Sequence, residues 1–235
     1  NTPDHDGRSP VYVAALQGEV CVIRALAELG ANVDTPMDDG RTPVYIAAQK
    51  GKVGAIRALA DLGADVNIPD EAGRFPVHIA ALQGQVEVIR ALARLGADVN
   101  TLHKYSGTPL FVAAATDNVN AVRVLSEVGA DVNIPTENGC TPVFIAAQED
   151  NVDSIRALVK LGANVDTPMN DGQTPVYYAA QEGKVGAIRA LAEFGANVDT
   201  PEHDGRTPMY VAALQGEEGA IRALAEFGAD VNTPD

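Results

Sequence analysis

Two acidic turns hold the residues that come nearest to a chemical site. The segments Asp4-His5-Asp6-Gly7 and Met37-Asp38-Asp39-Gly40 place carboxylates beside a glycine, as calcium-binding loops do. If the glycine of the first segment held the sixth position of such a loop, the twelfth position would be Val13, where the loop needs a bidentate Glu. The sequence also lacks phosphate-loop, zinc-protease and nucleophile-elbow motifs. We therefore expect no catalytic residues, no metal ligands and no cofactor.

Charge and cysteine content exclude further classes. The 235 residues include 17 Lys and Arg against 32 Asp and Glu, a formal net charge of -15. This charge disfavours nucleic acids and anionic membranes as partners, because both are bound through clustered cations. Apolar runs such as 110–115 fall far short of the ~18 residues that cross a bilayer. Cys21 and Cys140 form no disulfide framework, which favours an intracellular compartment.

The elements that must position any site recur with a period of 33 residues. Sliding the sequence against itself by this distance aligns seven units without insertion or deletion. We place the repeats of a single array at residues 6–38, 39–71, 72–104, 105–137, 138–170, 171–203 and 204–235. Each repeat has a proline followed by an apolar residue, a ring residue, another apolar or aromatic residue and Ala-Ala, beginning at Pro10, Pro43, Pro76, Pro109, Pro142, Pro175 and Pro208.

The second repeat shows why each unit predicts a helix, a turn and a helix. Thr42 can cap a helix start, and Pro43 has the φ of a first helical position. We expect helices over about 43–50 and 53–62, each ended by a glycine. The stretch 64–73 is rich in Asn, Asp, Pro and Gly and predicts an extended turn or short hairpin. One unit buries too little apolar surface to fold alone, so the copies must stack into an all-α solenoid.

The unit resembles the ankyrin repeat. Thr42-Pro43, the pair Ala47-Ala48 and the segment Gly63-Ala64-Asp65-Val66-Asn67 match the family's motifs and recur in register over residues 6–235. The resemblance implies a curved α-solenoid of helix pairs with hairpin or loop fingers at right angles to them. It also implies that a protein partner binds the concave face, which the finger tips and the exposed side of each first helix form.

One column departs from the family pattern. The family usually has His two residues after the helix proline, and here that column holds Tyr12, Tyr45, His78, Phe111, Phe144, Tyr177 and Tyr210. We interpret the rings as packing between neighbouring repeats, since aromatic stripes at a structural period are usually core. A ligand-stacking ladder is the alternative.

The third and fourth repeats depart from the others. Phe75 replaces the capping Thr of the third repeat, and His78 replaces its ring three residues later. We expect the Phe75 ring to compensate along the same helix face; drift and a binding patch are the alternatives. In the fourth repeat, His103-Lys104-Tyr105-Ser106-Gly107 replaces the acidic tip, so Tyr105 leads the binding residues that we predict.

The other tips are acidic, and they lie on the side that the resemblance implies for recognition. They include Asp38, Asp39, Asp70, Glu71 and Asp171, so we expect a protein partner with a basic surface, although an ordinary solvated surface is the alternative. The full set of predicted partner-binding residues is Asp38, Asp39, Arg41, Asp70, Glu71, Arg74, Phe75, His103, Lys104, Tyr105, Thr116, Gln148, Glu149, Asp171 and Glu182.

An arginine recurs on the second helix of every repeat, as at Arg57. A phosphate-binding stripe is one interpretation, but we favour ordinary helix pairs such as Arg57 with Asp61, four residues apart.

The predicted function is a non-catalytic scaffold for protein interaction. The alternatives are a structural spacer or spring within a longer array, and a targeting domain for an enzyme outside this segment. The first and last repeats lack polar outer faces; Ile23, Leu26, Leu214, Ile221 and Leu224 resemble their internal equivalents. We therefore expect an excerpt of a longer chain, or ends that stack head to tail on other copies.

Overall fold

The computed structural model describes residues 4–5, 7–103 and 106–232. Within them lie fourteen α-helices in seven pairs, and no strand. The first helices of the pairs are α1 Pro10–Gln17, α3 Pro43–Gln49, α5 Pro76–Leu82, α7 Pro109–Ala115, α9 Pro142–Gln148, α11 Pro175–Gln181 and α13 Pro208–Gln215. The second helices are α2 Val20–Glu28, α4 Val53–Asp61, α6 Val86–Arg94, α8 Val119–Glu127, α10 Val152–Lys160, α12 Val185–Glu193 and α14 Glu218–Glu226.

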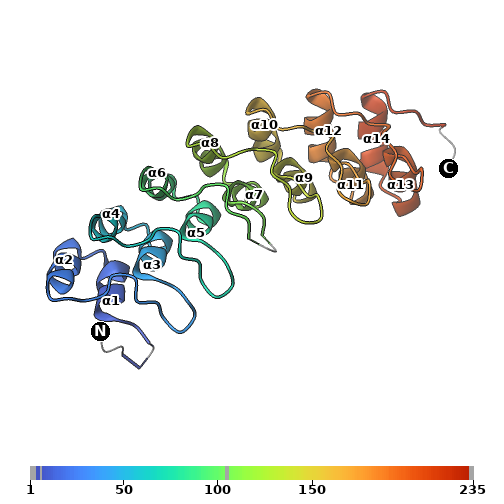
Figure 1. Ribbon diagram of the computed structural model, residues 1–235. Coiled ribbons are helices and arrows are strands. Elements are labelled where there is room, and N and C mark those ends of the chain that lie inside the picture. The colour runs from blue at the N-terminus through green and yellow to red at the C-terminus, as the bar shows by residue number, and fades with distance from the viewer. Residues whose placement is uncertain (1–3, 6, 104–105, 233–235) are drawn as a thin grey trace.

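The pairs stack in a curved row (Figure 1). First helices form one layer and second helices the other, and we call the surface of the second layer the outer face. The loop from each second helix to the next first helix projects on the opposite side, and we call this loop a finger. The predicted α-solenoid is confirmed. Of the extended turn and the short hairpin predicted for the fingers, the structure has turns, with a single β-bridge among the described residues, between His103 and Gly107.

The helix ends follow the predicted chemistry. Thr42 Oγ1 accepts the N–H of Tyr45 at 3.2 Å, and the hydroxyl before each helix proline does the same in every repeat except the third. Gly63 ends α4 with φ +90°, a left-handed conformation that costs glycine little. These local signals set where each helix begins and ends.

Buried apolar side chains run the length of the stack. In the second repeat Ala47, Ala48 and Leu59 are fully buried, and the small alanines allow close helix packing. The aromatic column is also core: its side chains are buried in the first six repeats and half-buried at Tyr210. The packing interpretation of this column is confirmed, because buried rings cannot form a ligand-stacking ladder.

Polar ladders join successive repeats. Asp34, Asn67, Asn100, Asn133, Asp166 and Asp199 each accept a backbone N–H 31 residues further on. On the outer face, an arginine pairs with an acid 37 residues further on in Arg24–Asp61, Arg90–Glu127, Arg156–Glu193 and Arg189–Glu226, at 2.7 to 3.2 Å. The predicted Arg57–Asp61 pair is therefore wrong: Asp61 faces the preceding repeat, where Arg24 reaches it.

Candidate functional site

The residue two positions before each helix proline divides the finger side of the molecule into two regions. We call it the finger-base position. It holds arginine at Arg8, Arg41, Arg74 and Arg206, but Gly107, Cys140 and Gln173 in the fourth to sixth repeats. A long charged side chain is thus replaced by short or uncharged ones in three consecutive units. The surroundings of this position differ accordingly.

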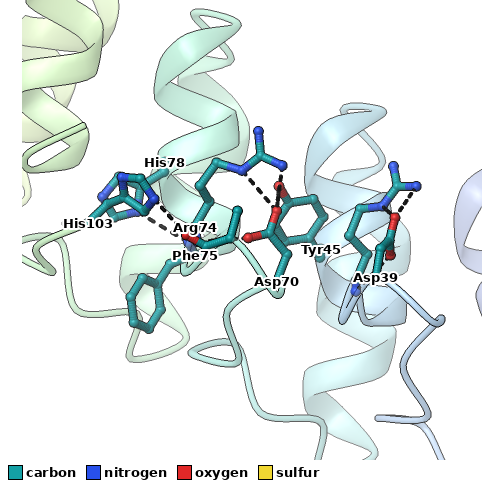
Figure 2. Close-up of polar contacts among 9 residues, drawn as sticks. Asp39, Tyr45, Asp70, Arg74, Phe75, His78 and His103 are labelled. Atoms are coloured by element: carbon teal, nitrogen blue, oxygen red, sulfur yellow. Dashed lines mark hydrogen bonds and ion pairs between the residues drawn. The ribbon is translucent and has the colours of Figure 1, made fainter. Parts of the chain in front are cut away.

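The second and third repeats form a polar network at their finger bases (Figure 2). Tyr45 donates its hydroxyl hydrogen to Asp70 Oδ2 at 2.8 Å, and Arg74 Nε donates to the same oxygen at 2.9 Å. Arg74 also donates its backbone N–H to Asp70 Oδ1 at 2.8 Å. In the preceding finger, Arg41 pairs with Asp39 at 2.6 Å. Both arginines are therefore committed to carboxylates of their own fingers.

Asp70 is a structural residue. Its side chain is 2% exposed, so the prediction that it offers an acidic tip to a partner is wrong. Burial would raise the pKa of its carboxyl, but the hydrogen bonds from Arg74 and Tyr45 outweigh burial and hold that pKa below its usual value. Burial and the bond to Asp70 raise the pKa of the Tyr45 hydroxyl. The network therefore stays ionised at Asp70 and neutral at Tyr45 around neutral pH.

Two histidines continue this network into the fourth repeat. His78 Nδ1 accepts the N–H of Phe75 at 3.3 Å, and its Nε2 lies 3.1 Å from the carbonyl oxygen of Gly107. His103 Nε2 lies 2.7 Å from the Ala72 carbonyl oxygen. His103 is 7% exposed, so the prediction that it presents itself to a partner is also wrong.

The third repeat has no capping hydroxyl, and the N–H of His78 donates to the carbonyl oxygen of Phe75 at 3.0 Å instead. The N–H of Phe75 points to His78, and the two rings lie 5.8 Å apart. The Phe75 ring thus lies beside His78 on the same helix face, as predicted, and the Phe75 carbonyl oxygen takes the place of the capping hydroxyl. Phe75 is half-buried against the core.

The fourth to sixth repeats form an apolar cluster instead. Phe111, Cys140 and Phe144 are buried together, apart from the main core, with Ile145, Met169 and Tyr178 packed on them. The rings of Phe144 and Tyr178 lie 5.5 Å apart. Burial raises the pKa of the Cys140 thiol to about 12, so this cysteine stays protonated and unreactive.

A hollow of about 390 Å³ opens over this cluster. Its apolar lining is half-buried at Ile145 and Met169, which leaves apolar atoms in reach of a ligand. Its polar rim includes exposed Glu137. We call it the concave hollow, and it is lined by Phe111, Thr136, Glu137, Asn138, Cys140, Ile145, Gln148 and Met169.

The remaining predicted site residues lie around these two regions. Gln148 lines the concave hollow, and Glu149 and Glu182 are exposed at the ends of α9 and α11. Burial and the charges of both glutamates raise the pKa of the Tyr178 hydroxyl. Asp38, Glu71, Thr116 and Asp171 are exposed, and Lys104 and Tyr105 lie outside the described residues.

The described residues include no group of three or more His, Cys, Asp or Glu side chains placed to hold a metal ion. In the same part of the chain, no helix has the length and hydropathy of a membrane span.

Comparison with known proteins identifies the fold. The family model for ankyrin repeats in three copies matches residues 1–70, 35–103, 77–169 and 163–235. The chain belongs to the ankyrin repeat family. Ankyrin repeat domains are modules of protein–protein interaction, so the expected class of function is confirmed at that level.

Two solved ankyrin repeat domains are similar along almost their whole length. The human ASB11 domain is 26% identical, with a TM-score of 0.80, and the match covers 95% of this chain and 99% of that one. The domain of Bcl-3, described as a unique member of the IkappaB protein family, is 25% identical with a TM-score of 0.83, over 94% of this chain and 100% of that one. No curated protein has a matching sequence.

Sequence reasoning missed four residues of the ankyrin concave face: Phe111 as a floor residue, Cys140, Ile145 and Met169. A signal for them was present. Aligning the finger-base position across repeats shows that arginine is replaced by Gly107, Cys140 and Gln173 in the repeats that form the cluster.

Proposed function

We propose that this ankyrin array is a non-catalytic scaffold that binds a protein partner on its concave face, at the finger tips and the exposed sides of the first helices. The concave hollow carries the proposal. It combines apolar atoms of Ile145 and Met169 with nearby carboxylates of Glu137, Glu149 and Glu182. An apolar side chain flanked by lysine or arginine would match both features.

Burial of one apolar side chain supports such an anchor energetically. Fully burying a leucine or phenylalanine side chain contributes about 1.5–3 kcal/mol, and interfaces depend on a few such anchors. The hollow is open on one side and its floor is already packed, so binding requires little rearrangement. The acidic rim and the net charge of -15 would accelerate the approach of a basic partner.

The test is a selection from a randomised peptide library displayed on phage, with the chain as target. We expect enriched sequences that place one bulky apolar residue next to lysine or arginine. Their affinity, measured by isothermal titration calorimetry, should fall about tenfold or more in Ile145→Glu and in Met169→Glu.

The matched control is Gln83→Glu, which puts the same charge on an exposed residue at the end of α5, outside the hollow. It should leave the affinity unchanged. Selection of no peptide, or peptides indifferent to both hollow variants, would contradict the proposal. That result would favour the structural spacer, which needs no ligand. An array that serves as the targeting domain of an enzyme would also bind a protein partner, so it predicts the same result as the scaffold.

A second proposal concerns the two end faces, which we infer to stack head to tail on other copies. Val22 and Leu29 are exposed on the first repeat, and a hollow of about 510 Å³ lies beside Val13 and Leu26. Leu214 and Phe227 are exposed on the last described repeat. Glu28 holds the position of Asp61, so a second copy could offer Glu28 to Arg222 as the next rung of the outer ladder.

Analytical ultracentrifugation over a wide concentration range tests the stacking. We expect association that weakens in Arg222→Glu and recovers when this variant is mixed with Glu28→Arg. A strict monomer at every concentration would contradict it.

A further inference from the structure

Four basic side chains of the outer face have no ion-pair partner among the described residues. They are Arg57, Arg94, Arg123 and Lys160, and all four are exposed. The chain has nearly twice as many acids as bases, so an acidic neighbour would be expected for each. They lack a partner because of their positions in the series of ion pairs that joins successive second helices.

The four residues form two breaks in that ladder. Each intact rung joins an arginine to the last residue of the next second helix, which is Asp61, Glu127, Glu193 or Glu226. In α6 and α10 the last residue is Arg94 or Lys160 instead. By the same offset of 37 residues, Arg57 meets Arg94 and Arg123 meets Lys160. Each break thus sets two cations where other repeats set a cation and a carboxylate.

A hollow of about 370 Å³ between α8 and α10 lies at the second break. Arg123 and Lys160 line it together, along with Asn120, whose amide can donate a hydrogen bond. Arg156 also lines it but is bound to Glu193 at 3.2 Å, and Asp153 is its one acid. The hollow therefore offers two uncommitted cations and space for a carboxylate between them.

We propose that this outer face binds an acidic segment of a protein, whose carboxylates take the places that Glu127 and Glu193 hold in intact rungs. This surface lies on the opposite side of the stack from the fingers, so it is independent of the proposed concave site (Figure 1). The intact rungs argue for a carboxylate, because there the same arginine column binds carboxylates at 2.7 to 3.2 Å.

The spacing of the breaks defines the segment further. Arg57 and Arg123 are two repeats apart, roughly 20 Å at the helix spacing of ~10 Å. An extended chain spans this distance in about six residues. Between the breaks lies the intact Arg90–Glu127 rung, whose arginine is already paired, so a continuous phosphate backbone finds no free cation there, whereas a peptide that is acidic only at its two ends needs none.

The test uses a fluorescein-labelled peptide with two Glu-Glu pairs separated by about five Gly or Ser residues. Its binding is measured by fluorescence anisotropy at about 10 mM salt, where the screening length is about 30 Å. Lys160→Glu supplies the missing carboxylate within the chain. We expect this variant to bind the peptide about fivefold or more weakly and also to unfold at a higher temperature. Arg94→Glu should act in the same way at the first break.

Lys50→Glu is the matched control, because it makes the same change of net charge on an exposed residue at the end of α3. It should bind as the wild type does, apart from a small general loss. No binding by the wild type at low salt, or equal losses in the Lys160 and Lys50 variants, would overturn the proposal. Tighter binding of an oligo-dT probe with the same Lys160 dependence would also overturn it, in favour of a phosphate ligand.

Discussion

The finger bases of the second and third repeats and those of the fifth and sixth share one backbone frame but present opposite surfaces. In the former, Arg41 and Arg74 lie over the concave face with their carboxylate partners, and the first-helix residues Ile46 and Ile79 are 3% and 4% exposed. In the latter, the equivalent residues Ile145 and Tyr178 are only half-buried. In these four repeats an arginine at the finger base accompanies a buried first-helix residue, and its replacement accompanies a half-buried one.

This difference shows that some acidic residues of the array stabilise the fold, whereas others remain available to a partner. Asp70 is buried in the polar network, whereas Glu137 stays exposed at the rim of the hollow, and Glu149 and Glu182 are exposed at the ends of α9 and α11. In the second and third repeats, which we call the polar half, hydrogen bonds and ion pairs hold the finger bases, and the first-helix isoleucines are buried. In the fourth to sixth repeats, which we call the apolar half, buried rings pack together beneath the concave hollow, which stays accessible.

The largest effect should come from the apolar half. Phe144→Ala removes a fully buried ring between Cys140 and Tyr178 and should lower the free energy of unfolding by about 3–5 kcal/mol, measured by urea denaturation. Phe144→Tyr, the ring that most other repeats carry, serves as control and should cost far less. A loss below about 1 kcal/mol for the alanine variant would show that the cluster is not a packed core.

Acid should destabilise the polar half through His78. Burial is the main reason that the pKa of His78 is lowered from 6.5 to about 4. The charge of His103 lowers this pKa further, and the hydrogen bond to Gly107 opposes the shift. The imidazole of His78 therefore binds a proton more tightly in the unfolded chain than in the folded one. As the pH falls from about 6.5 to about 4, the free energy of unfolding decreases. This loss amounts to about 3 kcal/mol. His78→Phe should abolish this part of the pH dependence in urea denaturation; an unchanged slope would contradict the assignment.

Removing the centre of the polar network should have the next effect. Asp70→Ala leaves the buried hydroxyl of Tyr45 without its acceptor and should cost about 2 kcal/mol. Asp38→Ala changes an exposed acid of the preceding finger and should stay within about 0.5 kcal/mol. Similar losses in the two variants would mean that Asp70 is no more structural than an ordinary tip residue.

The smallest effect is expected at the exceptional cap. Phe75→Thr restores the hydroxyl that other repeats use, but the N–H of His78, which this hydroxyl would bind, already donates to the carbonyl oxygen of residue 75 at 3.0 Å. The free energy of unfolding should therefore change by less than about 0.5 kcal/mol. A rise of several degrees in the melting midpoint would show that the third repeat lacks compensation.

Much of the fold could be predicted because its signals are local. Thr-Pro starts, the closing glycines and the period of 33 set the helix pairs, and the structure ends α3 and α4 within a residue of the predicted ends. The burial of the ring column also followed from its period. These features depend on neighbours in sequence and on a fixed stacking distance.

The site was harder to predict because it depends on contacts between repeats. Asp70, Met37 and Met169 occupy the same repeat position, and the sequence alone does not show that only Asp70 turns inward to Tyr45. The pairing of Arg24 with Asp61 likewise depends on how far one helix lies from the next. Only the change of the finger-base position from arginine to Gly107, Cys140 and Gln173 was open to sequence reasoning.

The most direct test of the concave hollow compares two methionines in these two regions. The chain has three, and Met37 and Met169 occupy the same position of repeats one and five. We would label the methionine methyl groups with ¹³C and titrate a library-selected peptide into the sample by NMR. We expect a saturable shift of the Met169 methyl signal, with those of Met37 and Met209 unmoved. Equal shifts at Met37 and Met169, or a bound peptide that leaves Met169 unmoved, would contradict it.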